Sequence, residues 1–262
     1  MGVRPPLRSV GPSERGALIR AVLFDLDDTL FDHRHASRQA LAAVRECHAT
    51  VALVDASDLD RRHAEILEAL HLRVLAKEMT LDDARQERFR LLFESVGVSA
   101  ADLEDGLLAR RAAGAYRTGY MQSWREVHGA TALLHALKPQ VRIGIVSNNL
   151  AREQHDKLRF CGFDRHLDAI VISEEAGVAK PDPAIFRQAL ERLPAEAAET
   201  VMIGDAWATD IAGARAAGMR AIWFNPCGTS RPEAWHEVEE IRALEPVPAV
   251  MSVVFGNDNR RK

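Results

Sequence analysis

The sequence predicts an α/β fold: a Rossmann-like parallel sheet with helices on both faces, plus an inserted all-helical domain. Three observations predict it. The unbroken apolar run at residues 21–24 is typical of a strand buried on both faces, as in the middle of a parallel sheet. Between residues 31 and 124 we find helical spacing and no convincing strand. Beyond this stretch strands and helices alternate, which is typical of βαβ units.

The bulk composition limits the class of protein. A chain of 262 residues can form one large domain or two smaller ones. Its formal net charge of -4 gives no general attraction to nucleic acid or to an anionic membrane, and no stretch approaches the roughly 18 apolar residues of a membrane span. The three cysteines form no CxxC pair, so we expect buried free thiols in a reducing cytoplasm. We therefore expect a cytoplasmic protein without nucleic-acid polymer or membrane as a partner, and the oligomeric state is left open.

Changes in composition and periodicity predict the boundaries of the parts. Residues 1–17 are polar and proline-rich and lack the apolar segment of a secretory signal, so they predict a disordered leader. Residues 18–34 and 122–256 are expected to form the α/β core, with the helical insert over residues 35–121 between them. Residues 257–262 are expected to be a frayed tail.

The insert is expected to contain four helices. Apolar residues at three- and four-residue steps indicate amphipathic helices, and Thr80 followed by Asp83 resembles a capping box. The expected helices cover about residues 36–56, 59–77, 80–96 and 99–118. Connections near residues 33–36 and 120–126 would act as hinges between insert and core.

Beyond the insert the core is expected to alternate between strands and helices. The expected strands are residues 141–147, 168–173, 200–205, 220–225 and, in the tail, about 237–241. The expected helices are residues 129–138, 150–160, 183–193, 210–217 and about 247–254. Because parallel strands end at one edge of a sheet, where open α/β sheets bind ligands, polar residues at these ends are expected to converge.

Several strand ends, together with one loop, carry the candidate site residues. They are Asp25, Asp27, Ser147, Asn148, Lys180, Asp205 and Asp210. Two carboxylates about 4 Å apart repel by roughly 4 kcal/mol at an effective dielectric of 20, so four of them in one crevice require a cation and one lysine is not enough. A hard divalent ion with oxygen ligands, Mg²⁺, fits this set. Since Mg²⁺ readily accepts phosphate oxygens, a phosphoryl group is the expected partner.

The motifs resemble those of the haloacid dehalogenase superfamily. Residues 25–29, DLDDT, match its DxDxT signature, and residues 204–210, GDAWATD, match GDxxxxD. Ser147 at the end of an apolar strand and Lys180 before a proline are similar to the second and third motifs. The motifs occur in the right order, and the resemblance covers about residues 20–225.

The resemblance implies roles for the charged residues. Asp25 would be the nucleophile that takes the phosphoryl group as an aspartyl-phosphate. Asp27 would protonate the leaving oxygen and then activate water. Lys180 would orient nucleophile and phosphate. Mg²⁺ would be held by Asp25, by the backbone carbonyl of Asp27 and by Asp205.

The resemblance also implies supporting roles. Ser147 and the backbone N–H of Asn148 would bind the substrate phosphate, and Thr29 would support that site by bracing the loop. Asp210 would order metal-bound water or pair with Lys180. The helical insert matches the family's mobile cap, which closes over the site and excludes water during transfer.

Further polar residues are expected to be bystanders or are left open. His33, Arg34 and His35 are expected to be solvent-facing hinge residues rather than substrate contacts. Asn149 would either touch phosphate or only cap the following helix. The arginines of the insert are expected to form mostly a solvated helix face, as at Arg85, Arg110, Arg111 and Arg117.

Asp27 favours one reaction over others within the superfamily. Haloalkanoate dehalogenases lack an acid two residues after the nucleophile, and phosphonatases need a cap lysine, for which Lys77 is poorly placed. We therefore expect hydrolysis of a phosphate monoester of a small metabolite, with a phosphomutase or a catalytically idle phosphate-binding protein as alternatives. Residues 171–181 are similar to pyrimidine 5′-nucleotidases and N-acylneuraminate 9-phosphatases, but substrate choice lies in the cap. A nucleoside monophosphate and a sugar phosphate are comparable expectations.

Overall fold

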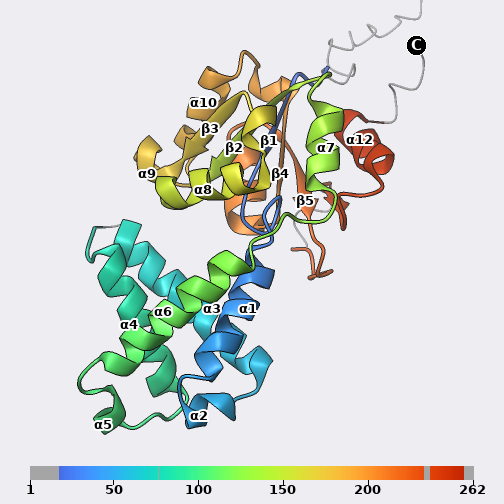
Figure 1. The fold of residues 1–262 in the computed structure, drawn as a ribbon. Helices are drawn as coiled ribbons and strands as arrows, with labels where there is room; N and C mark the ends of the chain where they lie inside the picture. Colours follow the sequence, from blue (N-terminus) through green and yellow to red (C-terminus); the bar gives the residue numbers. More distant parts are fainter. Residues whose placement is uncertain (1–17, 76, 233–236, 257–262) are drawn as a thin grey trace, which may run out of the picture.

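The computed structural model describes residues 18–75, 77–232 and 237–256 (Figure 1). The expected leader and tail, residues 1–17 and 257–262, lie outside this part. One lobe is a sheet with helices on both faces, and a group of helices lies beyond the edge at which β1 (Ala21–Phe24) ends.

The lobe that contains the sheet has six parallel strands in the order β3-β2-β1-β4-β5-β6. The other strands are β2 (Arg142–Ser147), β3 (Ala169–Ile172), β4 (Thr200–Gly204), β5 (Arg220–Phe224) and β6 (Glu239–Ile241). The chain adds strands first on one side of β1 and then on the other, so β1 lies at the switch point where such sheets bind ligands. Phe24 pairs with Ile145 and Ile203, so the ends of the three central strands are close in register.

Both faces of the sheet are covered, which explains the unbroken apolar run of β1. Val22 and Phe24 point into the cluster on one face, and Ala21 and Leu23 into the cluster on the other, all fully buried. The first face is covered by α7 (Ala130–Leu137), α8 (Ala151–Cys161) and α12 (Val247–Phe255), the second by α10 (Pro183–Arg192) and α11 (Ala212–Ala216). The expected α/β fold with a parallel sheet is confirmed.

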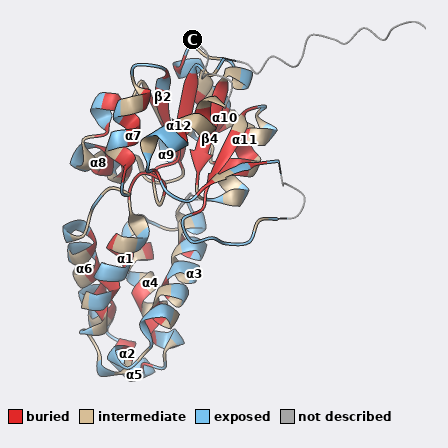
Figure 2. Cartoon of the chain, turned by 90° about the vertical axis from the view of Figure 1, so that its right-hand side faces the viewer, coloured by how far each residue is buried: buried red, intermediate tan, exposed pale blue. Residues whose placement is uncertain are grey.

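The second lobe is helical in its described residues. Its helices are α1 (His33–Arg45), α2 (Ala49–Ala52), α3 (Ala56–Leu75), α4 (Leu81–Ser95), α5 (Ala100–Leu103) and α6 (Leu107–Gln122). α6 packs against α1 and α4, and α3 against α4, around an interior that contains Phe89, Phe93 and Tyr116. Thr80 caps α4 by accepting a hydrogen bond from the N–H of Asp83 at 3.1 Å, as its spacing predicted. Figure 2 shows buried residues concentrated in the sheet and on the inner sides of these helices.

Several helices begin or end at residues other than those expected. The first expected helix of the insert is two helices, α1 and α2, and the fourth is divided by Gly106, whose φ of 66° is left-handed. Residues 33–36, near which a hinge is expected, form the first turn of α1, and Asp32 caps this helix by accepting the N–H of His35 at 3.0 Å. Residues 207–211 form a π-helical turn before α11, where a helix over 210–217 was expected.

Short elements complete the described chain. They are α9 (Ser173–Ala176) and the 3₁₀ turns Asp164–His166 and Ala197–Glu199. No helix within the described ranges is both long and apolar enough to cross a membrane. The three cysteines are free, but Cys227 is exposed and the other two are half-buried, so the expectation of buried thiols was wrong.

Candidate active site

Two carboxylates and one lysine meet below the end of β1. The Nζ of Lys180 lies 2.5 Å from Oδ1 of Asp25 and 2.7 Å from Oδ1 of Asp210. All three side chains are buried, and they come from the end of β1, the loop before α10 and the π-helical turn after β4. The two acidic neighbours raise the pKa of Lys180 against the effect of its burial, so this ammonium group stays charged.

A close approach at Gly204 lets Asp210 reach this cluster. The Oδ2 of Asp210 accepts a hydrogen bond from the N–H of Ala206 at 3.0 Å, which leaves Oδ1 for Lys180. A methyl group at Gly204 would overlap the carboxyl group of Asp210, so only glycine fits below that side chain. The small residue in the fourth motif therefore has a steric reason in this fold.

Asp205 adds a third carboxylate to this cluster, which then holds more negative charge than Lys180 can neutralise. One carboxylate oxygen each of Asp25, Asp205 and Asp210 lies within 4.8 Å of the others. Burial and the charges of Asp25 and Asp210 raise the pKa of Asp205 to about 8. Burial also raises the pKa of Asp25, to about 7, although Lys180 opposes this. These shifts show that the local positive charge is insufficient for three carboxylates.

The donor set fits a hard divalent cation. It consists of carboxylate oxygens alone, the ligands that Mg²⁺ prefers, and a 2+ charge would offset the effects of burial and of mutual repulsion that raise the pKa values of Asp25 and Asp205. Of the three side chains, Asp25 and Asp205 were expected metal ligands and Asp210 a supporting residue. The carboxyl group of Asp27 binds Lys157 instead and is not part of this cluster.

The carboxylate of Asp27 is held by three side chains of the segment that follows β2. Its oxygens accept hydrogen bonds from Nζ of Lys157 at 2.7 Å, Nε2 of Gln154 at 2.9 Å and Nδ2 of Asn149 at 3.1 Å. Lys157, next to it, lowers the pKa of Asp27 far below its usual range despite burial. The structure therefore favours the charged form of Asp27 and fixes the orientation of its carboxylate.

Lys157 and Gln154 were missed by the sequence reasoning. Lys157 is fully buried and also lies 3.3 Å from Glu153 and over the rings of Phe31 and Tyr120, at 5.0 and 5.7 Å from their centroids. The available signal was helical spacing, because Gln154 and Lys157 share the buried side of α8. Polar groups on a buried helix face need partners there, and Asp27 is that partner.

The expected phosphate-binding residues lie at the same edge. The hydroxyl of Ser147 accepts a hydrogen bond from Nε2 of Gln154 at 2.6 Å. The side chain of Asn148 binds the backbone of Lys180, accepting from its N–H at 2.7 Å and donating to its carbonyl at 2.8 Å. Asn148 thereby holds the loop that contains Lys180 against the end of β2.

Thr29 links the two acidic strand ends. Its hydroxyl donates to Oδ2 of Asp25 at 3.3 Å and accepts the N–H of Asp205 at 3.1 Å. Asn149 does not cap α8, whose N-cap is Leu150 without a side-chain bond, so that alternative was wrong.

Two residues at the start of α1 contact other parts of the protein. Nδ1 of His33 lies 2.7 Å from the hydroxyl of Tyr120. The guanidinium of Arg34 lies 3.0 Å from Oδ2 of Asp205 and 3.3 Å from Oδ2 of Asp28. The first turn of α1 therefore packs over the sheet edge, where His33 is half-buried, whereas Arg34 is exposed as expected and pairs with acidic residues of the site.

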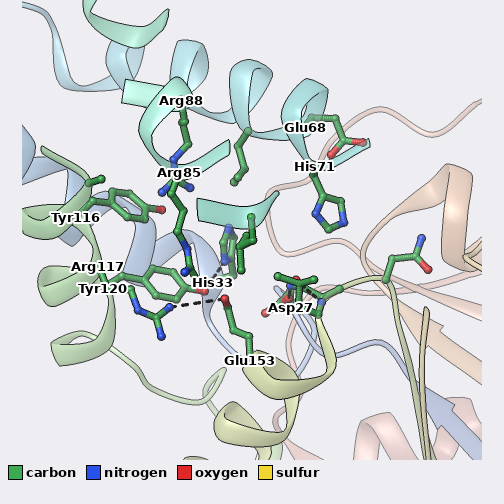
Figure 3. Close-up of a pocket in the computed structure, with 16 residues that line it drawn as sticks. Asp27, His33, Glu68, His71, Arg85, Arg88, Tyr116, Arg117, Tyr120 and Glu153 are labelled. Atoms are coloured by element: carbon green, nitrogen blue, oxygen red, sulfur yellow. Dashed lines mark hydrogen bonds and ion pairs between the residues drawn. The ribbon is translucent and has the colours of Figure 1, made fainter. Parts of the chain in front are cut away.

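A cavity of about 220 Å³ lies between the two lobes beside Asp27 (Figure 3). Its core side includes Asn149 and Glu153. Its other side is formed by the helical lobe and includes Arg85, which is half-buried, and Arg117, which is exposed as expected. The cavity is therefore the space where the remainder of a molecule reacting near Asp27 can lie.

Comparisons with known proteins agree with this site. The family model of haloacid dehalogenase-like hydrolases matches residues 19–218. The chain therefore belongs to the haloacid dehalogenase-like hydrolase (HAD) family, as its motifs indicated.

Relatives of the chain include named phosphatases. The HAD-hydrolase YfnB of Bacillus subtilis is 30% identical over 89% of this chain and 96% of its own length. N-acylneuraminate-9-phosphatase of Mus musculus is 28% identical over 90% of this chain and 95% of its own. Pyrimidine 5′-nucleotidase YjjG of Escherichia coli is 36% identical over 43% of this chain and 55% of its own. The expected resemblance to these two subgroups is confirmed.

The fold is also found in a solved relative. The crystal structure of Bacillus subtilis YfnB bound to magnesium superposes with a TM-score of 0.69 at 28% identity, covering 89% of this chain and 99% of that one. The arrangement of sheet and helical lobe is therefore shared with a HAD hydrolase.

Proposed function

We propose that this protein is a Mg²⁺-dependent phosphate-monoester hydrolase that acts on a small phosphorylated metabolite through an aspartyl-phosphate at Asp25. The observation that carries the proposal is that two aspartates at the end of β1, Asp25 and Asp27, contact different lysines. Asp25 is buried against Lys180, and Asp27 is held by Lys157 two residues further on. A nucleophile and a separate proton-transfer group are what phosphoryl transfer through a carboxylate requires.

The metal site supports the proposal. Asp25, Asp205 and the backbone carbonyl of Asp27 would hold Mg²⁺, with Asp210 in support through Lys180. Mg²⁺ would supply positive charge that neutralises the carboxylates and the phosphoryl oxygens. The magnesium-bound structure of YfnB supports this choice of ion.

The residues of the chain divide the work of the two steps. Asp25 attacks phosphorus while Lys180, Ser147 and the N–H of Asn148 bind the equatorial oxygens. Asp27 gives a proton to the leaving oxygen and later takes one from the attacking water. Because Asp27 is ionised beside Lys157, it must take up a proton from solvent before the first step, which requires substrate to weaken its contact with that lysine.

The helical lobe, α1 to α6, is proposed as the cap that covers the site. It forms one wall of the cavity beside Asp27, so it contacts the alcohol part of the substrate and excludes water. The names of the relatives, N-acylneuraminate-9-phosphatase and pyrimidine 5′-nucleotidase, support a sugar phosphate or a nucleoside monophosphate as the class of substrate.

The test is turnover of p-nitrophenyl phosphate with Mg²⁺ and with EDTA, followed by a phosphate-release screen over sugar phosphates and nucleotides. We expect Mg²⁺-dependent release of phosphate and its loss, by at least about a thousandfold, in Asp25→Asn. Asp156→Asn on α8, whose partner is the neighbouring Arg159, is the matched control and keeps activity. Turnover unaffected by EDTA, or a fully active Asp25→Asn, would contradict the proposal. Transfer of phosphate between hydroxyls without release would indicate a mutase.

A further inference from the structure

The cavity beside Asp27 contains a buried cation that forms no ion pair with a described residue. Arg88 reaches into it from α4 (Figure 3), and its guanidinium makes no hydrogen bond or ion pair with any described residue. Its Nε atom is inaccessible to water and lacks a partner. Arg85 and Arg117 line the same cavity but are paired, with Asp82 at 3.1 Å and Glu153 at 3.8 Å.

The surroundings of Arg88 hold its charged group in place without satisfying its hydrogen bonds. Its guanidinium carbon lies 4.7 Å from the ring centroid of Phe89 and 4.5 Å from that of Tyr116. These rings attract a cation, but their faces accept no strong hydrogen bond. Burial lowers the pKa of Arg88, which shows that desolvation exceeds the local compensation. A buried cation of this kind is costly unless an anion completes it.

The acidic residues of the cavity are already engaged or lie at the surface. Glu153 interacts with Lys157 at 3.3 Å as well as with Arg117. Asp27 is bound by Lys157, and Glu68 is exposed. The cavity wall on the cap side therefore presents an unpaired positive charge toward the space that the substrate would occupy.

We propose that Arg88 binds a second anionic group of the substrate, a carboxylate or a second phosphate, at the end away from the reacting phosphoryl group. The proposal rests on the proposed function. It narrows the substrate class to phosphate monoesters of alcohols that carry a carboxylate or a second phosphate. A guanidinium offers a planar pair of N–H donors that match the two oxygens of such a group. A neutral alcohol would leave this buried group unpaired, so the same site selects against it.

The first experiment compares substrates that differ only in the distal group. One pair is 6-phosphogluconate and sorbitol 6-phosphate, a second is 3-phosphoglycerate and glycerol 3-phosphate, and a third is fructose 1,6-bisphosphate and fructose 6-phosphate. We expect kcat/KM of the doubly charged member to exceed that of its partner by at least about tenfold in one or more pairs. Preference in the first two pairs identifies a carboxylate, and preference in the third identifies a phosphate. Absence of any such preference, including no turnover of all six compounds, overturns the inference.

The second experiment assigns the preference to Arg88. In Arg88→Gln the ratio of kcat/KM between charged and neutral members should fall to near one, and Arg88→Lys should retain part of it because the charge remains. Arg90→Gln is the matched control, since Arg90 lies on the same helix but pairs with Glu87 at 2.6 Å. An unchanged ratio in Arg88→Gln, with a thermal transition like that of the wild type, overturns the inference. If Arg88→Gln does not fold, Arg88→Lys carries the same comparison, and an unchanged ratio there would overturn the bidentate contact.

Failure of the inference and failure of the proposed function give different results. Turnover of p-nitrophenyl phosphate without any preference for a second charge would overturn only the role of Arg88. Absence of Mg²⁺-dependent turnover with every phosphate monoester would overturn the proposed function itself.

Discussion

The two lobes treat buried charge in opposite ways. In the lobe that contains the sheet, Lys180 and Lys157 each lie within 2.7 Å of an aspartate carboxylate, and both are buried almost completely. In the helical lobe, the buried Nε atom of Arg88 has no hydrogen-bond partner in the described protein. The core thus completes its own ionic contacts, whereas the cap does not.

The difference fits the tasks proposed for the two lobes. Groups that move a phosphoryl group and a proton must keep a fixed geometry, so preformed ionic contacts are useful in the core. A surface that selects a substrate can leave a donor open for the ligand to complete. This difference between the lobes applies to charged groups only. Among neutral groups, Oε1 of Gln154 in the core also lacks a partner among the described residues.

The largest effect is expected from breaking the completed cluster at Lys180. Lys180→Met leaves Asp25 and Asp210 buried without their cation, and loss of one partner from a buried pair costs about 3–5 kcal/mol. Chemical denaturation in EDTA at pH 7 measures this free energy of unfolding. Lys138→Met, which removes a partly exposed lysine 2.9 Å from Asp168, is the control and should cost about 1 kcal/mol or less. If both variants lose the same free energy of unfolding, the buried ion pairs of Lys180 contribute no more stability than a partly exposed ion pair.

A smaller effect on stability, and a distinct effect on catalysis, is expected at Lys157. Lys157→Met removes the cation that lowers the pKa of Asp27, so burial would raise that pKa. The stability from this pair is present above the unfolded aspartate pKa of about 3.9 and is lost as pH falls through the lower folded pKa. We expect a loss of about 2–3 kcal/mol at pH 7, since Asp27 is partly exposed. Because Asp27 must carry a proton in the first step, the basic limb of the kcat/KM profile should move to higher pH. A basic limb at the wild-type position would contradict the assigned contact.

The smallest effect is expected at His63 in the cap, where a substitution should change stability only at acidic pH. Burial, with Arg88 and His33 nearby, holds the pKa of His63 well below its usual range, so the folded protein binds fewer protons there than the unfolded chain. Stability should therefore fall as pH decreases below about 6.5, by up to about 1.4 kcal/mol per pH unit from this group. His63→Phe, placed against the rings of Phe89 and Tyr116, should reduce that slope between pH 6.5 and 5.

His128→Phe is the matched control for His63, because His128 is exposed and near Glu245 at 3.0 Å. It should leave the acid slope of His63 in place. Denaturation midpoints measured at several pH values distinguish the variants, and an unchanged slope in His63→Phe would contradict a neutral buried His63.

The sequence by itself determined the parallel sheet, the helical insertion and the family. The unbroken apolar strand, the helical spacing and the four motifs are local patterns, and each can be recognised without knowing what lies next to it in space. The edge of a parallel sheet then brings strand ends together, which is why Asp25, Lys180, Asp205 and Asp210 could be grouped in advance. Their catalytic roles remain predictions.

Only the tertiary structure decided which other charges belong to the site. Lys157 contacts Asp27 across 130 residues of sequence, and Arg34 contacts Asp205 across 171. Arg88 looked like any other arginine on a helix, and neither its burial nor its missing partner follows from the spacing of α4. The physical reason is that burial and pairing depend on how elements distant in the sequence pack against each other, and no local pattern records those contacts.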